Sequence, residues 1–421
     1  LWALKNETVP VDEGKLFKSG EHGFPRHDPL SKALSKVRFM DSVRGEAKEG
    51  DVCILGLDVG STTTKAVLMR CEDKAILAGV YLRTNGDPVG ASRRCYEEIA
   101  AQIKAPVKIV GLGVTGSGRQ IAGLHALSPA VINEIIAHAR AASYFDPEVD
   151  TIFEIGGQDA KYTFLTNGVA SDYAMNEACS AGTGSFLEES ALEALNLKVE
   201  DIGEIAIKGK QPPNFNDQCA AFIGSDIKTA IQNGISRDDI AAGLVYSICL
   251  NYLNRVKGNR AVGQKVFMQG GVCYNKAVPI AMANLTGKEI IVPPEPGLMG
   301  AFGVALETLS MLELKQIEPI DFDLKELANR QVVYDKPFVC AGGKEKCDRK
   351  CTISRIRIKE KVYPFGGACN KYYNQRISKK DADMEELDFV ALRERLLQQS
   401  AQGDGSSVSN EKNNVVINRQ T

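Results

Sequence analysis

The chain has 421 residues, of which 44% are hydrophobic and 25% charged, and its formal net charge is −2. These proportions exclude fibrous and intrinsically disordered classes, and at roughly 100–200 residues per domain the length allows several domains. A near-neutral chain gives no electrostatic reason to expect nucleic acid or membrane as a partner. No apolar run approaches the ~18 residues of a spanning helix and no secretory signal opens the chain, so we expect a cytoplasmic protein. Because the chain begins with Leu1 rather than Met, we expect it to be part of a longer polypeptide.

The composition divides the chain into four segments. Residues 1–50 are polar and Lys-rich with helix-breaking Gly and Pro, which predicts a leader or linker. Residues 51–315 carry the regular apolar patterns of a folded domain. Residues 316–395 are more weakly patterned and contain four cysteines, and residues 396–421 are rich in Ser, Gly, Asn and Gln, which predicts a disordered tail.

Strand and helix patterns alternate in the second segment. Short apolar runs ending in turn residues predict strands at 52–60, 65–69, 75–81, 107–114, 151–155, 265–268 and 290–292. The first three are joined by turns and are therefore expected to be antiparallel neighbours. Helical spacing occurs over 90–103, over most of 182–256 and over 298–312. Strands followed by helices, twice over, predict an α/β fold.

The first strand runs into a turn that is suited to phosphate. Gly60 permits a tight turn that exposes backbone N–H groups, and the residues after it add hydroxyl and ammonium donors: Ser61, Thr62, Thr63 and Lys65. Asp58, at the end of the strand, is expected to hold Mg²⁺ through water.

A second turn of the same kind follows the strand at 151–155. Gly156 and Gly157 let the backbone approach an anion. Asp159 is placed to face a metal or an attacking water, and Gln158 is a candidate for positioning that water.

A third turn, Gly270-Gly271, follows the strand at 265–268, with Asn275 close behind. A glycine pair allows a flat ring to lie against the backbone. Each of the three turns alone is a weak signal, whereas their order and spacing are specific.

A dinucleotide-binding alternative rests on residues 111–116, which fit G-x-G-x-x-G, and on Glu134 as a ribose-binding acid. The residues that follow are a poor opening for a tightly packed helix, which disfavours a Rossmann oxidoreductase. The chain lacks G-x-x-x-x-G-K-[ST], which disfavours a P-loop NTPase.

The three turns resemble the phosphate-1, phosphate-2 and adenosine motifs of the acetate kinase/sugar kinase/Hsp70/actin superfamily, whose two-lobed fold is ribonuclease H-like. More narrowly, residues 51–312 resemble the BadF/BadG/BcrA/BcrD-type ATPases, which are activators of 2-hydroxyacyl-CoA dehydratases and relatives of benzoyl-CoA reductase subunits. One departure is Glu154, where the second phosphate motif usually has Asp. Glu154 keeps the negative charge but carries it on a longer side chain.

Two cysteines precede predicted helix starts, Cys179 and Cys219. A helix N-terminus favours a thiolate, but two thiolates cannot complete a four-cysteine iron–sulfur site unless a two-fold dimer supplies the other two. Spacing alone favours ordinary buried cysteines. The resemblance implies instead that both are ligands of one [4Fe–4S] cluster shared between two protomers.

The other cysteines fall into two groups. Core packing is expected for Cys53, Cys71, Cys95, Cys249 and Cys273. Four more form a C-x₆-C-x₃-C-x₁₇-C group among basic residues: Cys340, Cys347, Cys351 and Cys369. They are candidates for Zn²⁺ or a second iron–sulfur cluster, with unliganded thiols as the alternative.

The resemblance implies an ATPase that uses ATP and Mg²⁺ to drive a low-potential electron from the cluster of a homodimer. The implied acceptor is a 2-hydroxyacyl-CoA dehydratase or related reductase, and the implied donor is ferredoxin or flavodoxin. A small-molecule kinase, such as an amino-sugar kinase with Asp159 as its catalytic Asp, is the main alternative. A non-catalytic ATP-binding scaffold is another.

Overall fold

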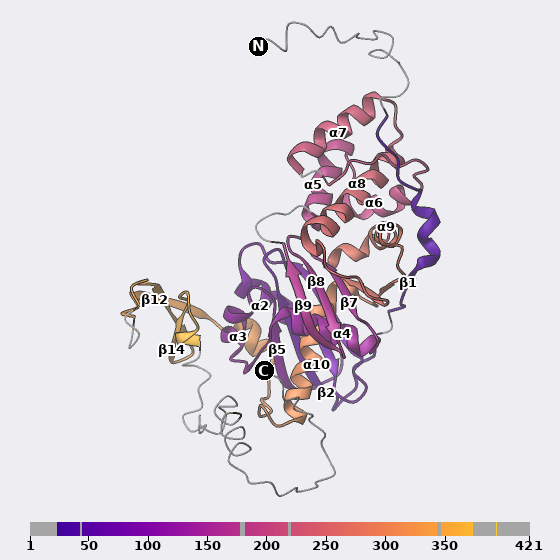
Figure 1. The fold of residues 1–421 in the computed structure, drawn as a ribbon. Helices are drawn as coiled ribbons and strands as arrows, with labels where there is room; N and C mark the ends of the chain where they lie inside the picture. The colour runs from indigo at the N-terminus through magenta and orange to yellow at the C-terminus, as the bar shows by residue number, and fades with distance from the viewer. Residues whose placement is uncertain are drawn as a thin grey trace, which may run out of the picture. The chain divides into compact units, whose positions relative to one another are not determined.

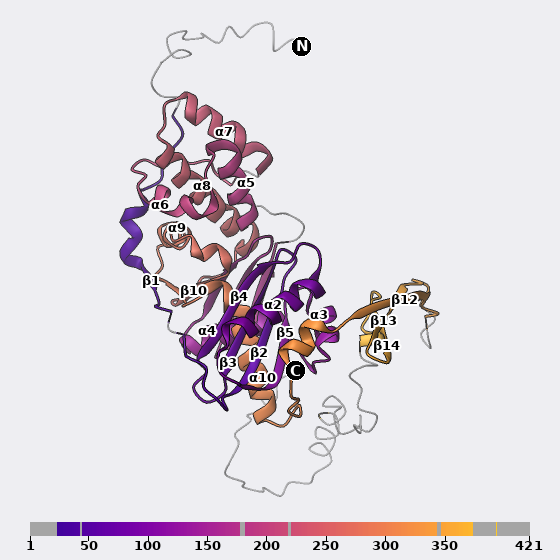
Figure 2. The ribbon, with the colours of Figure 1, turned by 180° about the vertical axis from the view of Figure 1, so that it is seen from behind.

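The structure is a computed structural model that describes residues 23–42, 44–176, 182–217, 220–342, 347–373 and 393. These residues form two compact units that divide between Val332 and Val333. The first unit contains two sheets and most of the helices, and the second contains a separate small sheet (Figures 1 and 2). No helix within the described ranges is long and apolar enough to cross a membrane.

The first lobe is built on a five-stranded sheet of order β4-β3-β2-β5-β6. Its strands are β2 (Val52–Val59), β3 (Thr63–Arg70), β4 (Ile76–Arg83), β5 (Lys108–Thr115) and β6 (Ala130–Val131). The first three are antiparallel, as predicted, and the last two are parallel to β2. Helices α2 (Pro88–Gln102) and α3 (Arg119–Ala126) cover one face and α10 (Met299–Glu313) the other. Burial on both faces explains why these strands are continuous apolar runs.

The second lobe repeats the scheme in a six-stranded sheet of order β1-β11-β10-β7-β8-β9. Its strands are β1 (Val37–Phe39), β7 (Thr151–Ile155), β8 (Ala160–Thr166), β9 (Val169–Met175), β10 (Val266–Gln269) and β11 (Ile290–Val292). An antiparallel meander, β7-β8-β9, is again extended by parallel strands beside its first member. The predicted two-lobed α/β fold is confirmed.

A group of helices gathers at one end of the second lobe (Figure 1). They are α5 (Gly184–Leu195), α6 (Val199–Ile207), α7 (Ala220–Gln232), α8 (Arg237–Asn251), the π-helix η3 (Tyr252–Lys257) and α9 (Ala277–Thr286). Their apolar faces form the largest core of the protein with β7, β8 and β10. Short 3₁₀ turns, η4 (Gly271–Tyr274) and η5 (Pro296–Leu298), follow β10 and β11.

Two helices connect the lobes. Helix α10 packs on the first sheet, and α4 (Glu134–Phe145) packs on β8 and β9 of the second. They cross so closely that a Cβ on Gly303 would overlap the backbone carbonyl oxygen of Ala137. The lobes therefore meet through backbone-to-backbone contact.

Residues 23–39 lie within the stretch for which the composition predicts a leader or linker, yet they contribute to the second lobe. The 3₁₀ helix η2 (Leu30–Lys36) packs on α9, and β1 pairs in parallel with β11. An edge strand of three residues has no measurable periodicity, so its sequence does not reveal it.

The first compact unit continues past residue 315, to Val332. Helix α11 (Leu324–Asn329) packs on α2, and Arg330 Nη1 donates a 2.7 Å hydrogen bond to the carbonyl oxygen of His125. The second unit has three strands in the order β12-β13-β14, namely β12 (Val332–Val339), β13 (Thr352–Ile358) and β14 (Lys361–Phe365). The predicted tail over 396–421 lies outside the described residues.

Candidate functional site

Two equivalent turns face one pocket between the lobes. In the β2–β3 turn the Gly60 amide donates to the Thr63 carbonyl oxygen at 2.9 Å, and in the β7–β8 turn the Gly156 amide donates to that of Asp159 at 2.8 Å. The first and second predicted turns are thus brought together, and Asp58, Ser61, Thr62, Thr63, Gly157, Gln158 and Asp159 line the same pocket. A Cβ on Gly157 would lie 3.3 Å from Thr62 Cγ2, so the turns nearly touch.

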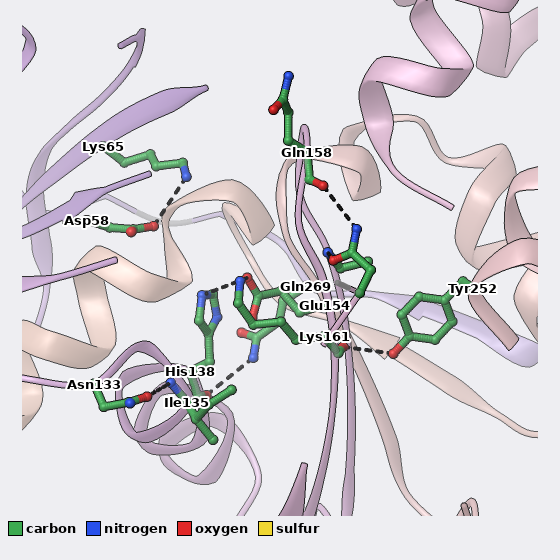
Figure 3. Close-up of polar contacts among 12 residues, drawn as sticks. Asp58, Lys65, Asn133, Ile135, His138, Glu154, Gln158, Lys161, Tyr252 and Gln269 are labelled. Carbon is green, nitrogen blue, oxygen red and sulfur yellow. Dashed lines mark hydrogen bonds and ion pairs between the residues drawn. The ribbon is translucent and has the colours of Figure 1, made fainter. Parts of the chain in front are cut away.

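An acid–lysine pair stands beside each turn, as Figure 3 shows. Lys65 Nζ lies 3.3 Å from Asp58 Oδ2, and Lys161 Nζ lies 2.9 Å from Glu154 Oε1. In both hairpins the two residues are direct cross-strand partners. Burial lowers the pKa of Lys65, but Asp58 outweighs this effect and holds the pKa above its ordinary value. The pocket therefore contains fixed ammonium groups next to carboxylates.

Glu154 is as buried as Asp58, and a helix also reaches it. His138, on α4, places Nε2 3.3 Å from Glu154 Oε1. Burial raises the pKa of Glu154, but His138 and Lys161 outweigh burial and lower it below its ordinary value. The start of α4 is fixed by Asn133, whose side chain accepts a 2.8 Å hydrogen bond from the Ile135 amide.

Glu134, at the first position of α4, also lines the pocket between the two turns. Burial raises its pKa against the effect of Lys161, and Glu154 and Asp58 add to the rise. The sequence offers Glu134 only as a ribose-binding acid, and the structure places it among the pocket carboxylates instead. Carboxylate oxygens are the ligands that Mg²⁺ takes, usually with several waters. Among the described residues, no three His, Cys, Asp or Glu side chains are grouped so as to hold a metal ion directly.

A wider cleft of about 600 Å³ adjoins this pocket. Gly271 of the predicted glycine pair lies at its wall, and a Cβ there would overlap the Tyr81 hydroxyl; the preceding Gly270 has φ +100°. The rings of Tyr81 and Tyr274 meet edge to face at 6.1 Å. Together with the aliphatic side chains of Leu187 and Val199, they give the cleft an apolar wall that fits a flat ring.

Two buried polar atoms point to a missing ligand. Thr62 Oγ1 and Asn275 Nδ2 have no hydrogen-bond partner within the part of the chain that the structure describes. Thr62 lines both cavities and Asn275 lines the wider one. Buried donors without partners cost about 1–3 kcal/mol each, so a polar ligand in the cleft would relieve both.

An ion pair spans the cleft. Arg83, on β4 of the first lobe, places Nη2 3.1 Å from Glu188 Oε2, on α5 of the second. Both side chains line the wider cleft. Neither was singled out from the sequence, because their pairing depends on how the lobes close.

His138 and Lys161 were also missed. Lys161 could have been identified by analogy with the first hairpin. There Lys65 lies opposite Asp58, and the same spacing places Lys161 opposite Glu154. His138 had a weaker signal, namely its position four residues after Glu134 behind an Asn N-cap. The proposed cluster ligands, Cys179 and Cys219, lie outside the described residues.

Comparison with known proteins identifies relatives over this part of the chain. Residues 55–308 match the model of the BadF/BadG/BcrA/BcrD ATPase family. The 2-hydroxyisocaproyl-CoA dehydratase activator of Clostridioides difficile is 33% identical over 253 residues, 60% of this chain and 93% of the relative. The (R)-2-hydroxyglutaryl-CoA dehydratase activating ATPase of Acidaminococcus fermentans is 31% identical over 255 residues, 60% of this chain and 95% of the relative. The solved structure of the Clostridium difficile activator with bound ADPNP superimposes with a TM-score of 0.55 at 30% identity, covering 64% of this chain and 99% of that one.

Proposed function

Because this chain belongs to the BadF/BadG/BcrA/BcrD ATPase family, we propose that it is the ATP-hydrolysing activator of a partner CoA-ester dehydratase or reductase. In this proposal, two protomers share one [4Fe–4S] cluster and deliver a low-potential electron to the partner. The electron comes from ferredoxin or flavodoxin. One feature carries the proposal: the segment that contains Cys179 is hydrogen-bonded at both of its ends to the second phosphate-type turn.

The first end is Asn176. Its Nδ2 donates to the Gln158 carbonyl oxygen at 3.1 Å, and its Oδ1 accepts from the Ala160 amide at 2.7 Å (Figure 3 shows Gln158 beside this contact). The second end is the start of α5, where the Gly184 amide donates to Gly156 O at 2.9 Å and the Ser185 amide donates to Gly157 O at 2.8 Å. A shift of this turn on loss of a phosphate would therefore move both ends of the segment.

ATP fits the two adjoining cavities. Its base would enter the apolar part of the cleft beside Gly270 and Gly271, where Asn275 offers a free amide donor. Its phosphates would lie between the Gly60 and Gly156 turns, with Lys65 nearby. Mg²⁺ would be held near Asp58 with waters completing its shell. Asp159 and Gln158 would orient the attacking water.

Features around the starts of α5 and α7 support a [4Fe–4S] cluster shared between two protomers. Cys219 directly precedes α7, and α7 packs against α5. Phe222, on the first turn of α7, is 65% exposed in the single chain, as expected of an apolar residue covered by a second copy. A [4Fe–4S] cluster would supply one-electron chemistry whose potential depends on charge, hydrogen bonds and exposure.

Anaerobic purification and reconstitution test this proposal. We expect about two irons and two sulfides per chain, because one four-iron cluster serves two chains, and an EPR signal on reduction. Cys179→Ala and Cys219→Ala should each abolish the signal, whereas Cys71→Ala should leave it intact. Absence of iron after reconstitution, with ATPase activity retained, would overturn the redox part of the proposal.

A further inference from the structure

The second unit carries a cluster of thiols that the proposed function does not use. Of the nine cysteines that the structure describes, five lie in the first unit and four in the second. All four of the latter line a single cavity: Cys340, Cys347, Cys351 and Cys369. They are free thiols from four separate points of the chain, and the fold alone brings them together.

The strand arrangement explains the convergence. Cys340 directly follows β12 and Cys351 directly precedes β13, and the Cys340 amide donates a 2.8 Å hydrogen bond to the Cys351 carbonyl oxygen. Strand β14 is antiparallel to β13, with Phe365 opposite Ser354, so Cys369 emerges at the same end of the sheet. The ends of three neighbouring strands thus present three of the four cysteines, and Cys347 lies in the loop between β12 and β13.

Two glycines shape the backbone around these cysteines. Gly342 has φ +85°, and a Cβ there would overlap the Cys347 carbonyl oxygen. Gly367 has φ +95°, and a Cβ there would lie 2.9 Å from Ile353 Cδ1 and 3.9 Å from Cys351 Cβ. Both glycines adopt a left-handed conformation, in a space where a Cβ would not fit. They therefore let the chain bend tightly beside Cys347 and Cys351.

The described part of the second unit buries few apolar side chains. Its buried apolar side chains, among the residues described, are Ile353, Ile356 and Ile358. Val333, Tyr334 and Val339 on β12 are all more than half exposed. Small folded units with few buried apolar side chains are usually stabilised further by disulfides or a metal. These thiols are unpaired, which leaves the metal.

We propose that Cys340, Cys347, Cys351 and Cys369 bind one structural Zn²⁺ ion as a four-thiolate site. In the structure no three of these four described thiols are yet grouped closely enough to hold an ion directly. Binding would therefore displace the thiol protons and rotate the side chains into the cavity they line, where Zn–S bonds are about 2.3 Å long. Lys350 and Lys371 line the same cavity and offset the excess negative charge of four thiolates around a divalent ion. Cysteines on the paired ends of a short antiparallel sheet are typical of zinc ribbons, which favours Zn²⁺ over a second iron–sulfur cluster.

Metal analysis of the full chain, purified without chelator and without iron reconstitution, tests this assignment. We expect about one zinc per chain that survives dialysis. The double variant Cys340→Ser/Cys351→Ser should lose it, while Cys71→Ser, a half-buried thiol of the first unit, should keep it. ATPase activity should be unchanged in both variants, which separates failure of this site from failure of the proposed function.

A second measurement guards against simple misfolding of the variant. Replacement of zinc by Co²⁺ in the unmodified chain should give sulfur-to-cobalt charge-transfer absorption and the visible bands of tetrahedral cobalt. Cys369→His should retain the ion and shift those bands. Iron and sulfide at these four cysteines, a metal-free chain with four titratable thiols in this unit, or zinc retained by the double variant would each overturn the proposal.

Discussion

Glu154 is the residue on which the polar contacts of the second lobe converge. Its carboxylate lies within 3.3 Å of both Lys161 and His138, while only 7% of its surface is exposed. Its counterpart Asp58 pairs with Lys65 at the pocket wall. The two acids therefore differ in restraint, since one is held from two elements and the other sits on a single hairpin.

Replacing Lys161 tests how much this buried pair contributes to stability. Lys161→Met removes one partner and leaves a buried carboxylate, so we expect a loss of about 3 kcal/mol in the free energy of unfolding. Urea denaturation measures it. The double variant Lys161→Met/Glu154→Gln should lose clearly less than the sum of the two single changes. A Lys161→Met protein as stable as the unmodified chain would show that the pair contributes nothing.

The same carboxylate predicts a pH dependence. Because the pKa of Glu154 is lower in the folded protein than its ordinary 4.5, its ionised form stabilises the fold at neutral pH. That stabilisation is lost as the pH falls below 4.5 and through the folded pKa. Denaturation midpoints measured from neutral to acid pH should fall less steeply for Glu154→Gln than for the unmodified chain. Parallel curves would contradict the assignment.

At the scale of elements, the crossing of α4 and α10 connects the nucleotide cleft to both sheets. A Cβ on Gly300 would lie 2.7 Å from Asp58 Oδ2 and 3.1 Å from His138 Nε2, so α10 passes directly behind the pocket. Helix α4 supplies Glu134 and His138 from the other side. Movement between the lobes must therefore pass through this crossing.

Gly303→Val should show how tight the crossing is. Its side chain would meet the Ala137 backbone rather than a flexible side chain, so we expect a loss of about 1–3 kcal/mol in stability, measured by thermal unfolding. Gly224→Ala is the matched control on α7, where a Cβ meets nothing within 4 Å. A helical glycine there should tolerate alanine with a gain of about 0.5–1 kcal/mol. Equal effects of the two changes would refute the crossing as a constraint.

The Arg83–Glu188 ion pair is expected to affect nucleotide release rather than stability. The side chains of Arg83 and Glu188 are 56% and 39% exposed, so Arg83→Ala should change stability by less than about 1 kcal/mol. Because the pair spans the cleft, nucleotide release should nevertheless become several-fold faster, as measured by displacement of a fluorescent ATP analogue. Arg83→Glu/Glu188→Arg should restore the slower release. Unchanged release in Arg83→Ala would mean that the pair does not hold the lobes together.

The sequence predicts individual strands and turns better than the contacts between elements that lie far apart in the chain. Residues 52–59 read as a strand because they are apolar on both faces, and the Gly60 and Gly156 turns are marked by residue type. Strand β1 could not be predicted, since its three residues pair with Ile290 some 250 positions away. Likewise His138 became a site residue only because the packing of α4 brings it against Glu154 on β7. Long-range packing, rather than local propensity, decides such positions.

At the scale of the whole molecule, the proposed function requires ATP hydrolysis to be coupled to an event at Cys179. Asn176→Ala removes the contact before the cysteine segment but leaves the turn that faces the nucleotide. We expect ATPase activity to stay within a few-fold, while ATP-dependent reduction of the partner enzyme falls at least ~10-fold, since a loss of about 1.4 kcal/mol in coupling is a factor of ten. Asn329→Ala, on α11, is the control. Parallel loss of both activities would contradict the coupling role.

The β2–β3 and β7–β8 hairpins form an internal structural repeat. Asp58 and Lys65 face one another across β2–β3, and Glu154 and Lys161 do so across β7–β8, with the same seven-residue interval. The two hairpins are thus two versions of one structural unit with unequal anchoring. The acid of the second is longer by one methylene group and also contacts His138 on α4, so we expect the first hairpin to be the more compliant of the two.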